Sequence, residues 1–262
     1  MINPESLKIS IITICYNRVA TIEQTIQSVL QQTYSNIEYI VIDGASIDGT
    51  KTIIEKYASQ IDIYISEPDN GMYNALNKGI NLSTGDVICL LHSDDIFYSN
   101  DILSKYAQLF IETNTDLIYA NGFYIPLKTK NEKEIINRIY KSKPFKKWYL
   151  YFGWIPLHTT IFAKKKLFDK FGLYEENYII ASDYEISLRW FMNNEIKKIF
   201  LDEWVVKMRL GGKSTTFYLQ KQKSKEDLEI INKYNLYGNF TLMMKIIRKL
   251  PQYFKPKFFK YL

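Results

Sequence analysis

The sequence predicts an α/β fold, in which a doubly wound, mostly parallel sheet is flanked by helices and followed by a C-terminal helical extension. Short apolar runs alternate with segments of helical periodicity through roughly the first 95 residues. Polar residues follow the ends of several of these runs, and helical spacing dominates the end of the chain. Alternation of this kind is typical of parallel strands that are joined by right-handed helical crossovers.

The first half of the chain supplies most of this pattern. Strands are expected at residues 8–14, 37–42, 61–65 and 88–91. Helices are expected at residues 22–30, 53–57 and 72–82. The run at 88–91 shows no alternation of apolar and polar residues, which favours a strand that is buried on both faces. Since parallel strands end along one edge of a sheet, residues 13–18, 43–48 and 92–95 are expected to converge there.

The second half is predicted in less detail. Helices are expected at 101–112, 164–171 and 182–190, and further helices after 216. Strands are expected at 116–124, 161–163, 197–201 and 205–208. The charged segment 128–147 is expected to be an exposed hairpin or loop. Ser182 or Asp183 is expected to cap the helix that follows, since either side chain can accept from free backbone N–H groups. With no internal repeat or low-complexity linker, one continuous domain plus an extension is favoured.

The composition sets limits on the class of protein. Apolar residues make up 47% of the chain, which is ordinary for a globular protein, and no stretch has the roughly 20 apolar residues that a membrane-spanning helix needs. Cys15 and Cys89 both lie in apolar runs, which favours reduced thiols and the cytosol. The first residues lack the basic and apolar regions of a secretory leader. We therefore expect a cytoplasmic protein.

The charge is concentrated at the C-terminus. The chain has 34 basic and 28 acidic residues, and residues 241–262 contain six basic residues and no acid, so the remainder balances at 28 of each. A surface that coats nucleic acid is not indicated. In residues 243–262 the basic side chains interleave with aromatic and aliphatic ones, which suits the surface of an anionic membrane. The alternative is a C-terminal helix that packs on the core and exposes a basic face.

Two adjacent acids, Asp94 and Asp95, follow the buried run at 88–91. In open α/β sheets the carboxyl ends of the strands are where ligands bind. Carboxylates there suit a hard divalent cation, which keeps coordination positions free for substrate phosphates. The pair by itself leaves a second interpretation open, in which the two acids only cap the next helix.

The first half has the layout of a nucleotide-binding half-fold without the usual dinucleotide fingerprint. No Gly-x-Gly-x-x-Gly follows the first expected strand, which argues against a nicotinamide or flavin enzyme. A nucleotidylyltransferase would need a Gly-rich basic loop at the same position, and Arg18 is the one basic residue there.

Five segments resemble the nucleotide-sugar glycosyltransferases of family 2, which have the Rossmann-like GT-A fold. They occur in the family's order, at residues 10–18, 41–50, 70–79, 84–95 and 181–189. The resemblance spans roughly residues 8–216. It implies a GT-A domain at 1–216, with a nucleotide-binding half at 1–98 and an acceptor half at 99–216, followed by a basic and aromatic helical extension at 217–262.

The resemblance implies a set of residues around the nucleotide-sugar donor. Asp43 would contact the base or ribose, although Asp43-Gly44 could also be only a turn after a strand. Lys78 would lie near the base or pyrophosphate, although it could be only a solvated charge on a helix. The remaining donor-binding residues implied by the resemblance are Thr13, Tyr16, Asn17, Ser93 and Asp94.

Asp94 matches the last acid of the family's Asp-x-Asp motif. The resemblance therefore implies that Asp94, with Asp95 in support, binds Mg²⁺ or Mn²⁺, which bridges the donor's pyrophosphate. His92 stands where the first acid of the motif is common. That departure removes one anionic contact and puts the contact on the ribose side in doubt.

Asp183 matches the family's general base, which takes the proton of the acceptor hydroxyl as its oxygen attacks the anomeric carbon. Asp183 could instead be only a helix cap, and Glu185 is the fallback base. His158 resembles a Pro-x-His segment of one branch of the family, which makes it a candidate contact for the acceptor, the metal or the diphosphate, or else a structural histidine. Lys213 lies in a Gly-rich segment that resembles a mobile loop over the donor, or a plain turn.

The expected function is that of an inverting, metal-dependent glycosyltransferase. It would move a hexose or N-acetylhexosamine from a nucleotide diphosphate, UDP above all, onto a hydroxyl of a cell-surface polysaccharide or lipid-linked oligosaccharide. Its expected location is cytoplasmic, with peripheral attachment to the inner face of the plasma membrane. Two rivals stay open: a nucleotidylyltransferase on the same half-fold, and a non-catalytic scaffold at the membrane surface.

Overall fold

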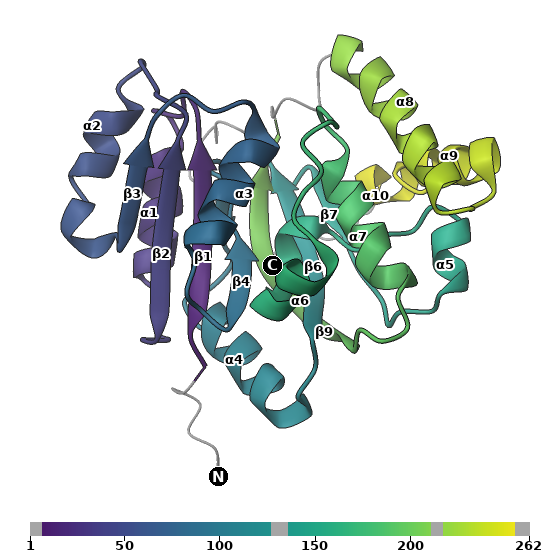
Figure 1. Cartoon of the computed structure of the whole chain (residues 1–262), viewed down its shortest axis with the longest axis horizontal. Coiled ribbons are helices and arrows are strands. Elements are labelled where there is room, and N and C mark those ends of the chain that lie inside the picture. The colour runs from purple at the N-terminus through teal and green to yellow at the C-terminus, as the bar shows by residue number, and fades with distance from the viewer. Residues whose placement is uncertain (1–6, 127–135, 211–216, 255–262) are drawn as a thin grey trace.

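The computed structural model describes residues 7–126, 136–210 and 217–254, whose strands form one curled sheet (Figure 1). The strand order runs β3 (Ile63–Ser66), β2 (Ile37–Asp43), β1 (Ile9–Cys15), β4 (Val87–Leu90), β8 (Phe162–Lys164), β6 (Leu117–Ile125), β9 (Lys198–Arg209) and β5 (Asp95–Phe97). A further strand, β7 (Arg138–Tyr140), pairs with β6. The sheet continues across the boundary expected at residue 98, because β5 of the first half pairs with β9 of the second.

The first four strands are parallel, as the alternating pattern predicts. They are connected by α1 (Ile22–Leu30), α2 (Thr50–Glu55) with the short 3₁₀ helix η2 (Ala58–Gln60), and α3 (Met72–Leu82). Beyond β4 the sheet becomes mixed. Strand β8 is antiparallel to both β4 and β6, β9 is parallel to β6, and β5 is antiparallel to β9. The α/β fold class is confirmed. The parallel pairs are those among β1 to β4 in the first half of the chain, together with the β6–β9 pair.

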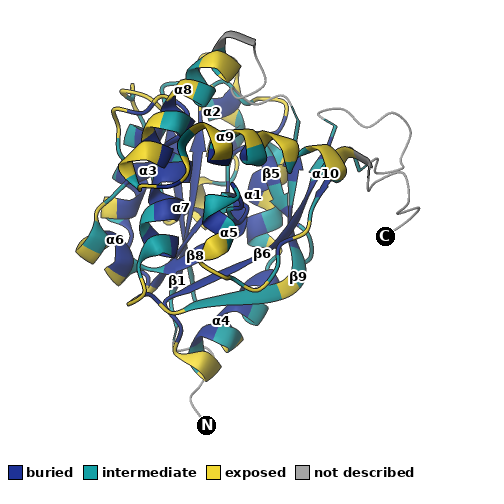
Figure 2. Cartoon of the chain, turned by 90° about the vertical axis from the view of Figure 1, so that its right-hand side faces the viewer, coloured by how far each residue is buried: buried dark blue, intermediate teal, exposed yellow. Residues whose placement is uncertain are grey.

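Two layers of helices cover the two faces of the sheet. Ile12 and Ile14 of β1 belong to a core with α3, α6 (Lys165–Phe171) and α7 (Ser182–Met192). Ile9 and Ile11 of the same strand belong to the opposite core, with α1, α2 and α4 (Ile102–Thr113). This alternation is the period of two that a strand imposes on its side chains. Figure 2 shows the strands mostly buried between the two layers.

The C-terminal extension is helical within its described residues. It consists of α8 (Phe217–Lys233), α9 (Gly238–Ile247) and α10 (Leu250–Phe254). Helix α8 contacts α7, and α9 packs against α8 and beside α5 (Trp148–Tyr151) (Figures 1 and 2). Within the described ranges, every helix is too short or too polar to pass through a bilayer.

Several local predictions are wrong. The described part of 128–147 includes one strand of a hairpin, as expected, because β7 pairs antiparallel with β6, but Ile139 of β7 is buried and this strand is therefore not fully exposed. The strands expected at 197–201 and 205–208 are one strand, since β9 accommodates an irregular register opposite Asn121 without ending. Asp95 begins β5 and caps no helix. The N-cap of α7 is Ala181, whose side chain has no polar group, in place of Ser182 or Asp183.

Candidate active site

The loops after β1 and β2 are tied together into one rim at the carboxyl edge of the sheet. The backbone N–H of Asn17 donates to Ser46 Oγ at 2.8 Å, and the N–H of Ile47 donates to Asn17 Oδ1 at 2.9 Å. Asn17 has a φ of 53°, a left-handed conformation that asparagine tolerates better than most residues. Tyr16 stands on this rim with 55% of its surface exposed, so its ring is available to a ligand.

Thr13 and Asp43 lie beneath the rim and are fully buried. The Asp43 carboxylate accepts hydrogen bonds from the hydroxyls of Ser46 and Ser66, the latter at 2.6 Å. The Thr13 hydroxyl accepts from the Tyr39 hydroxyl at 3.2 Å. These side chains therefore stiffen the rim from below, and the expected contact of Asp43 with a base or ribose stays a prediction.

Lys78 reaches the same edge from α3. Its Nζ lies 2.6 Å from Glu67 Oε1 and 2.6 Å from Asp69 Oδ1. A methyl group placed on Gly44 would lie 3.4 Å from both Asp69 and the Tyr16 ring, so the Lys78–Asp69 pair stands beside the rim. Burial by itself would lower the pKa of Lys78. The hydrogen bonds that its ammonium group donates to Asp69 and Glu67 outweigh the effect of burial and raise this pKa. The sequence did not identify Asp69 as a partner of Lys78, because its segment was interpreted only as a turn.

The acid loop after β4 separates its two carboxylates. Asp94 is partly exposed, and within the described ranges its carboxylate accepts no hydrogen bond, while its carbonyl accepts from Arg209 Nη1 at 3.0 Å. Asp95 is 4% exposed, and burial followed by the nearby Asp94 charge raises the pKa of its carboxyl well above the ordinary value. Ser93, directly before the two acids, is also buried. Asp94 therefore presents the available charge of this loop, and Asp95 turns inward.

The residues present fit a divalent cation that is held mainly by its substrate. The described part of the chain contains no cluster of three or more His, Cys, Asp or Glu side chains that could hold a metal ion. Mg²⁺ and similar cations are commonly bound through one or two carboxylates plus substrate phosphates. Asp94, whose carboxylate is without a hydrogen bond from the described residues, meets that requirement, and the supporting role of Asp95, which is 4% exposed, stays a prediction.

Two histidines connect the acid loop with Asp183. His92 Nε2 lies 3.1 Å from His158 Nε2, and His158 Nδ1 lies 3.4 Å from Asp183 Oδ2. His158 belongs to the short 3₁₀ helix η3 (His158–Thr160), and Asp183 lies in the first turn of α7. Burial, in spite of the Asp183 charge, lowers the pKa of His158 to about 4, so the ring is neutral at pH 7. Tertiary structure thus brings together residues that are 66 and 25 positions apart in the chain.

Asp183 is kept ionised by cations from the C-terminal extension. Burial by itself would raise the pKa of this carboxyl, but Lys223 of α8, then His158 and Lys245 of α9, lower it below the ordinary value. The carboxylate retains 25% exposure, so one side remains open to a substrate. Sequence reasoning missed both lysines, because nothing in their spacing relates them to position 183.

The backbone in front of Asp183 is held by a buried glutamate from α8. Glu226 is 4% exposed and accepts hydrogen bonds from the N–H groups of Ile179, Ile180 and Ala181, each at 3.0 Å. On the other side, the Tyr73 hydroxyl of α3 donates to the Ile180 carbonyl at 2.6 Å. Contacts from α8 and α3 therefore hold the loop that leads into Asp183.

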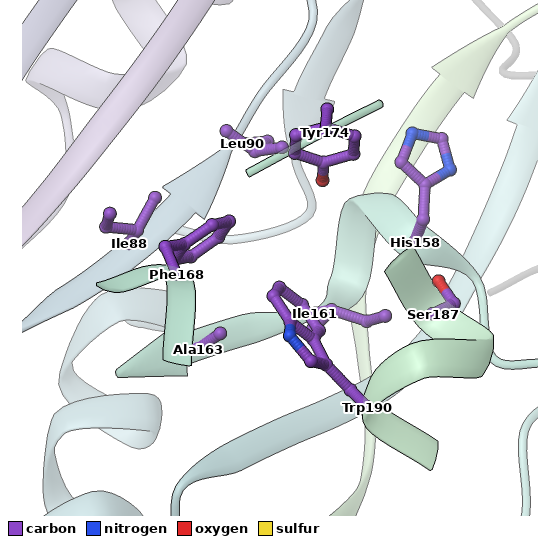
Figure 3. A pocket seen from close by; sticks show the side chains of 9 residues that line it. All are labelled: Ile88, Leu90, His158, Ile161, Ala163, Phe168, Tyr174, Ser187 and Trp190. Atoms are coloured by element: carbon purple, nitrogen blue, oxygen red, sulfur yellow. The ribbon is translucent and has the colours of Figure 1, made fainter. Parts of the chain in front are cut away.

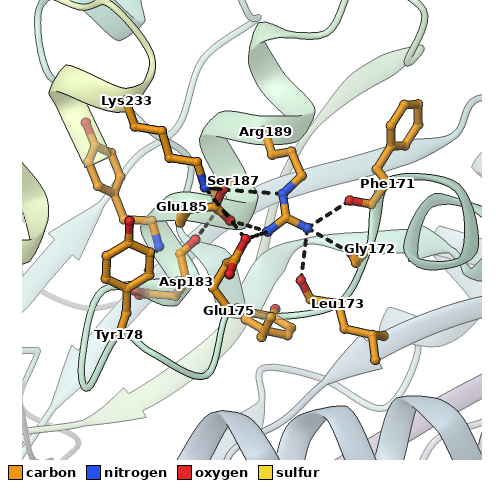
Figure 4. A network of polar contacts seen from close by, with 12 residues as sticks. Phe171, Gly172, Leu173, Glu175, Tyr178, Asp183, Glu185, Ser187, Arg189 and Lys233 are labelled. Carbon is orange, nitrogen blue, oxygen red and sulfur yellow. Dashed lines mark hydrogen bonds and ion pairs between the residues drawn. The ribbon is translucent and has the colours of Figure 1, made fainter. Parts of the chain in front are cut away.

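Glu185 does not face the site. It is fully buried, and its carboxylate is bonded by Arg189, by Lys233 Nζ at 2.8 Å and by the Tyr234 hydroxyl at 2.7 Å (Figure 4). Arg189 is bonded in turn to three backbone carbonyls, those of Phe171, Gly172 and Leu173. Since these partners occupy Glu185, it joins α7 to α8 and is unsuited to be a fallback base or an acceptor contact.

A small cavity of about 10 Å³ lies behind the histidines (Figure 3). It is lined largely by apolar side chains, among them Leu90, Ile161 and Trp190, and His158 borders it. A volume near that of one water probe cannot take a sugar. Asp94 and Asp183 are both partly exposed, so a substrate can approach them without entering this cavity. Lys213 lies outside the described residues.

Comparisons with known proteins give the family. Residues 10–171 match Glycosyl transferase family 2. An uncharacterised glycosyltransferase of Rickettsia prowazekii (strain Madrid E) is 32% identical over 218 residues, which cover 79% of this chain and 65% of the relative. A PGL/p-HBAD biosynthesis glycosyltransferase of Mycobacterium bovis (strain BCG / Pasteur 1173P2) is 27% identical over 212 residues, 79% of each chain. The chain thus spans about two thirds of the Rickettsia relative.

Solved structures share the fold. Staphylococcus aureus TarS 1–349 in complex with UDP-GlcNAc superposes with a TM-score of 0.66 at 17% identity, over 86% of this chain and 67% of that one. The mannosyltransferase PcManGT from Pyrobaculum calidifontis, in complex with GDP-Man and Mn²⁺, gives a TM-score of 0.64 at 15% identity, over 98% and 78%. These likenesses establish the GT-A fold, and the sequence match establishes that this chain belongs to glycosyl transferase family 2.

Proposed function

We propose that the protein is an inverting, metal-dependent glycosyltransferase that moves a sugar from a nucleotide diphosphate, UDP above all, onto a hydroxyl of a cell-surface polysaccharide or lipid-linked oligosaccharide. The single observation that carries the proposal is the chain of contacts that runs from His92, two residues before Asp94, through His158 to Asp183. The TarS and PcManGT structures hold UDP-GlcNAc and GDP-Man, and the second also holds Mn²⁺. Those ligands support a nucleotide sugar and a divalent cation here.

Asp183 is proposed as the general base. Its lowered pKa keeps the carboxylate charged at neutral pH, so it can accept the proton of an acceptor hydroxyl. The acceptor oxygen forms a bond to the anomeric carbon while the bond from that carbon to the diphosphate breaks. Attack from the side opposite the diphosphate inverts the anomeric centre. His158, neutral and 3.4 Å from Asp183, holds the carboxylate in place.

On the donor side, Tyr16 and Asn17 are proposed to border the nucleotide, and Lys78, whose partner Asp69 lies beside this rim, is proposed to meet its base or pyrophosphate. Asp94 would hold Mg²⁺ or Mn²⁺ through its free carboxylate. When bound, such a cation neutralises charge on the leaving diphosphate, so no acidic group is needed there. The finer choice of hexose or N-acetylhexosamine depends on the acceptor half.

The test uses two variants of the acidic residues. Thermal shift with UDP-GlcNAc, GDP-mannose and a dTDP-sugar, each with and without Mn²⁺, identifies the donor. Asp94→Asn should lose the Mn²⁺-dependent shift. Asp183→Asn should keep the shift but release nucleotide diphosphate at least about 100-fold more slowly in the presence of a cell-envelope extract, as loss of a general base predicts.

Other outcomes identify the rivals. Unchanged Mn²⁺-dependent binding in Asp94→Asn would remove the metal role, and near-normal turnover in Asp183→Asn would place the base elsewhere. Formation of pyrophosphate from a nucleoside triphosphate and a sugar phosphate would indicate a nucleotidylyltransferase. A wild-type protein that binds none of the three donors would indicate a scaffold.

A further inference from the structure

Helix α9 exposes its apolar side and buries its polar side. Its two buried residues are Thr241 and Lys245. Its exposed side carries four large apolar residues, each between 42% and 51% exposed: Phe240, Met243, Ile246 and Ile247. A helix on the surface of a water-soluble domain normally turns its apolar stripe to the core. The reversed arrangement leaves this apolar stripe available for contact with a membrane or another macromolecule.

The reversed orientation is fixed by contacts on the inner side. The Thr241 hydroxyl donates to the Tyr151 carbonyl at 2.7 Å, and Lys245 Nζ lies 2.8 Å from Asp227 and 3.1 Å from the centre of the Tyr184 ring. At Gly153 an added Cβ would lie 2.4 Å from the Lys245 nitrogen, so the two backbones touch there. Helix α9 could therefore turn its apolar side inward only by breaking these contacts.

The exposed stripe extends beyond α9 into a broader surface (Figure 2). Along the chain it continues from Tyr237 to Leu250 and Tyr253, at helical spacing. Sideways it reaches α5, because the Phe240 ring contacts Phe152 at 5.7 Å and Phe152 contacts Trp148 at 5.6 Å. We call this surface the outer apolar face; its exposed members are Trp148, Tyr237, Phe240, Met243, Ile246, Ile247, Leu250 and Tyr253.

The segments that contain the outer apolar face are basic. Apart from Lys245, which lies on the inner side of α9, residues 141–151 and 237–253 have six lysines and arginines and no aspartate or glutamate. Lys146 and Lys147 are exposed directly before Trp148. Aromatic, aliphatic and basic side chains on one surface suit the interface of an anionic bilayer, where rings and aliphatic groups enter the headgroup layer and lysines meet lipid phosphates.

We infer that the outer apolar face docks on an anionic bilayer and that the acceptor is a glycan carried by a lipid of that bilayer. The inner side of α9 touches Tyr184, the neighbour of Asp183, and Lys245 of α9 is one of the cations that lower the pKa of Asp183, so the proposed base lies on the inner side of the helix that docks. A sugar on a lipid headgroup could reach Asp183 from there. The second part of the inference rests on the proposed function, whereas the docking itself does not.

The experiment measures sedimentation of the full chain with vesicles of phosphatidylcholine containing about 30% phosphatidylglycerol, an anionic lipid. The triple variant Phe240→Ser/Met243→Ser/Ile246→Ser should lose at least about tenfold in partition coefficient. Lys146→Ala/Lys147→Ala should lose about 30-fold, from ~1 kcal/mol for each lysine. The matched control, Lys51→Ala/Lys56→Ala on α2 at the other end of the molecule (Figure 1), should sediment like wild type.

Every outcome decides for or against the inference. Equal sedimentation of all variants, or no sedimentation of the wild type, would overturn it. A wild-type dimer that becomes monomeric in the serine variant, without vesicle binding, would assign the face to a second copy of the chain. Nucleotide diphosphate release from the donor by hydrolysis, measured without vesicles, should be equal in all variants. Absence of a Mn²⁺-dependent thermal shift with every donor in the wild type, with vesicle binding intact, would refute the proposed function alone.

Discussion

At the scale of single residues, His158 joins the electrostatics of the site to the stability of the fold. Its ring is held neutral by burial, although the Asp183 charge beside it favours the protonated form. The ring therefore stays in place without competing for a proton that Asp183 is to accept. A neutral buried ring lowers the free energy of unfolding in mildly acidic solution, because the same histidine takes up a proton there once the chain is unfolded.

The pH dependence of stability tests this state of His158. The pKa of the ring is about 4 in the folded chain and 6.5 without perturbation. Between those values the unfolded chain binds a proton that the folded chain does not, so the free energy of unfolding falls as the pH is lowered through this window. Urea unfolding at pH 7 and pH 4.5 should show a loss for wild type that exceeds the loss for His158→Gln by about 2 kcal/mol. Equal losses would mean that the ring is already protonated in the fold.

At the scale of elements, α8 fixes the position of the base from outside the catalytic half. Glu226 binds the three backbone N–H groups that precede α7, and Lys223 of the same helix lowers the pKa of Asp183. Helix α7 itself has no side-chain cap, so the glutamate from α8 supports the chain where a cap is absent. The C-terminal extension is therefore part of the candidate active site and more than a link to a membrane.

Replacing Glu226 tests this positioning role. Glu226→Ala leaves three N–H groups without this partner, two of them buried, and should lower the free energy of unfolding by about 1–3 kcal/mol. Nucleotide diphosphate release in the presence of acceptor should fall at least about tenfold, while Mn²⁺-dependent donor binding stays unchanged, because misplacement of a base affects turnover more than donor affinity. Glu229→Ala, at an exposed position of the same helix, is the matched control and should resemble wild type in both measurements. Equal turnover in the two variants would assign Glu226 to stability only.

At the scale of the whole molecule, one arginine connects the acceptor half to the acid loop. Arg209 stands at the end of β9 and donates to the Asp94 carbonyl at 3.0 Å and to the Gln24 side chain of α1. Through β9 it is also joined to β6 and β5. The position of Asp94 therefore depends on strands from both halves of the chain.

Arg209→Met should raise the dissociation constant for the donor with Mn²⁺ about tenfold, since a charge-assisted hydrogen bond of ~1.5 kcal/mol or more to the acid loop is lost. Isothermal titration calorimetry, with the donor that the thermal shift identifies, measures this dissociation constant. Arg138→Met is the control, because Arg138 stacks on Tyr124 and donates to Gln252 of α10 and not to the acid loop. A similar change in both variants would indicate general loosening of the fold.

The sequence by itself determined the parallel half of the fold, the family and the two acids proposed for catalysis. Each depends on local information: strand and helix periodicity, and short segments such as the one ending in Asp94. Helix α3 has the bounds that its spacing predicts, because its apolar side alone decides where it packs. The charge of the C-terminal segment was also evident, since composition requires no fold.

Only the tertiary structure decided which side chains share the site. Lys223, Lys245 and Glu226 meet the base or its loop across more than 35 positions of chain, and the burial of Asp43 and Glu185 follows from partners on other elements. The reversal of α9 likewise depends on contacts of Thr241 and Lys245 with α5, α7 and α8. Periodicity records which residues of a helix share a side, but only packing decides whether that side faces the core or a partner.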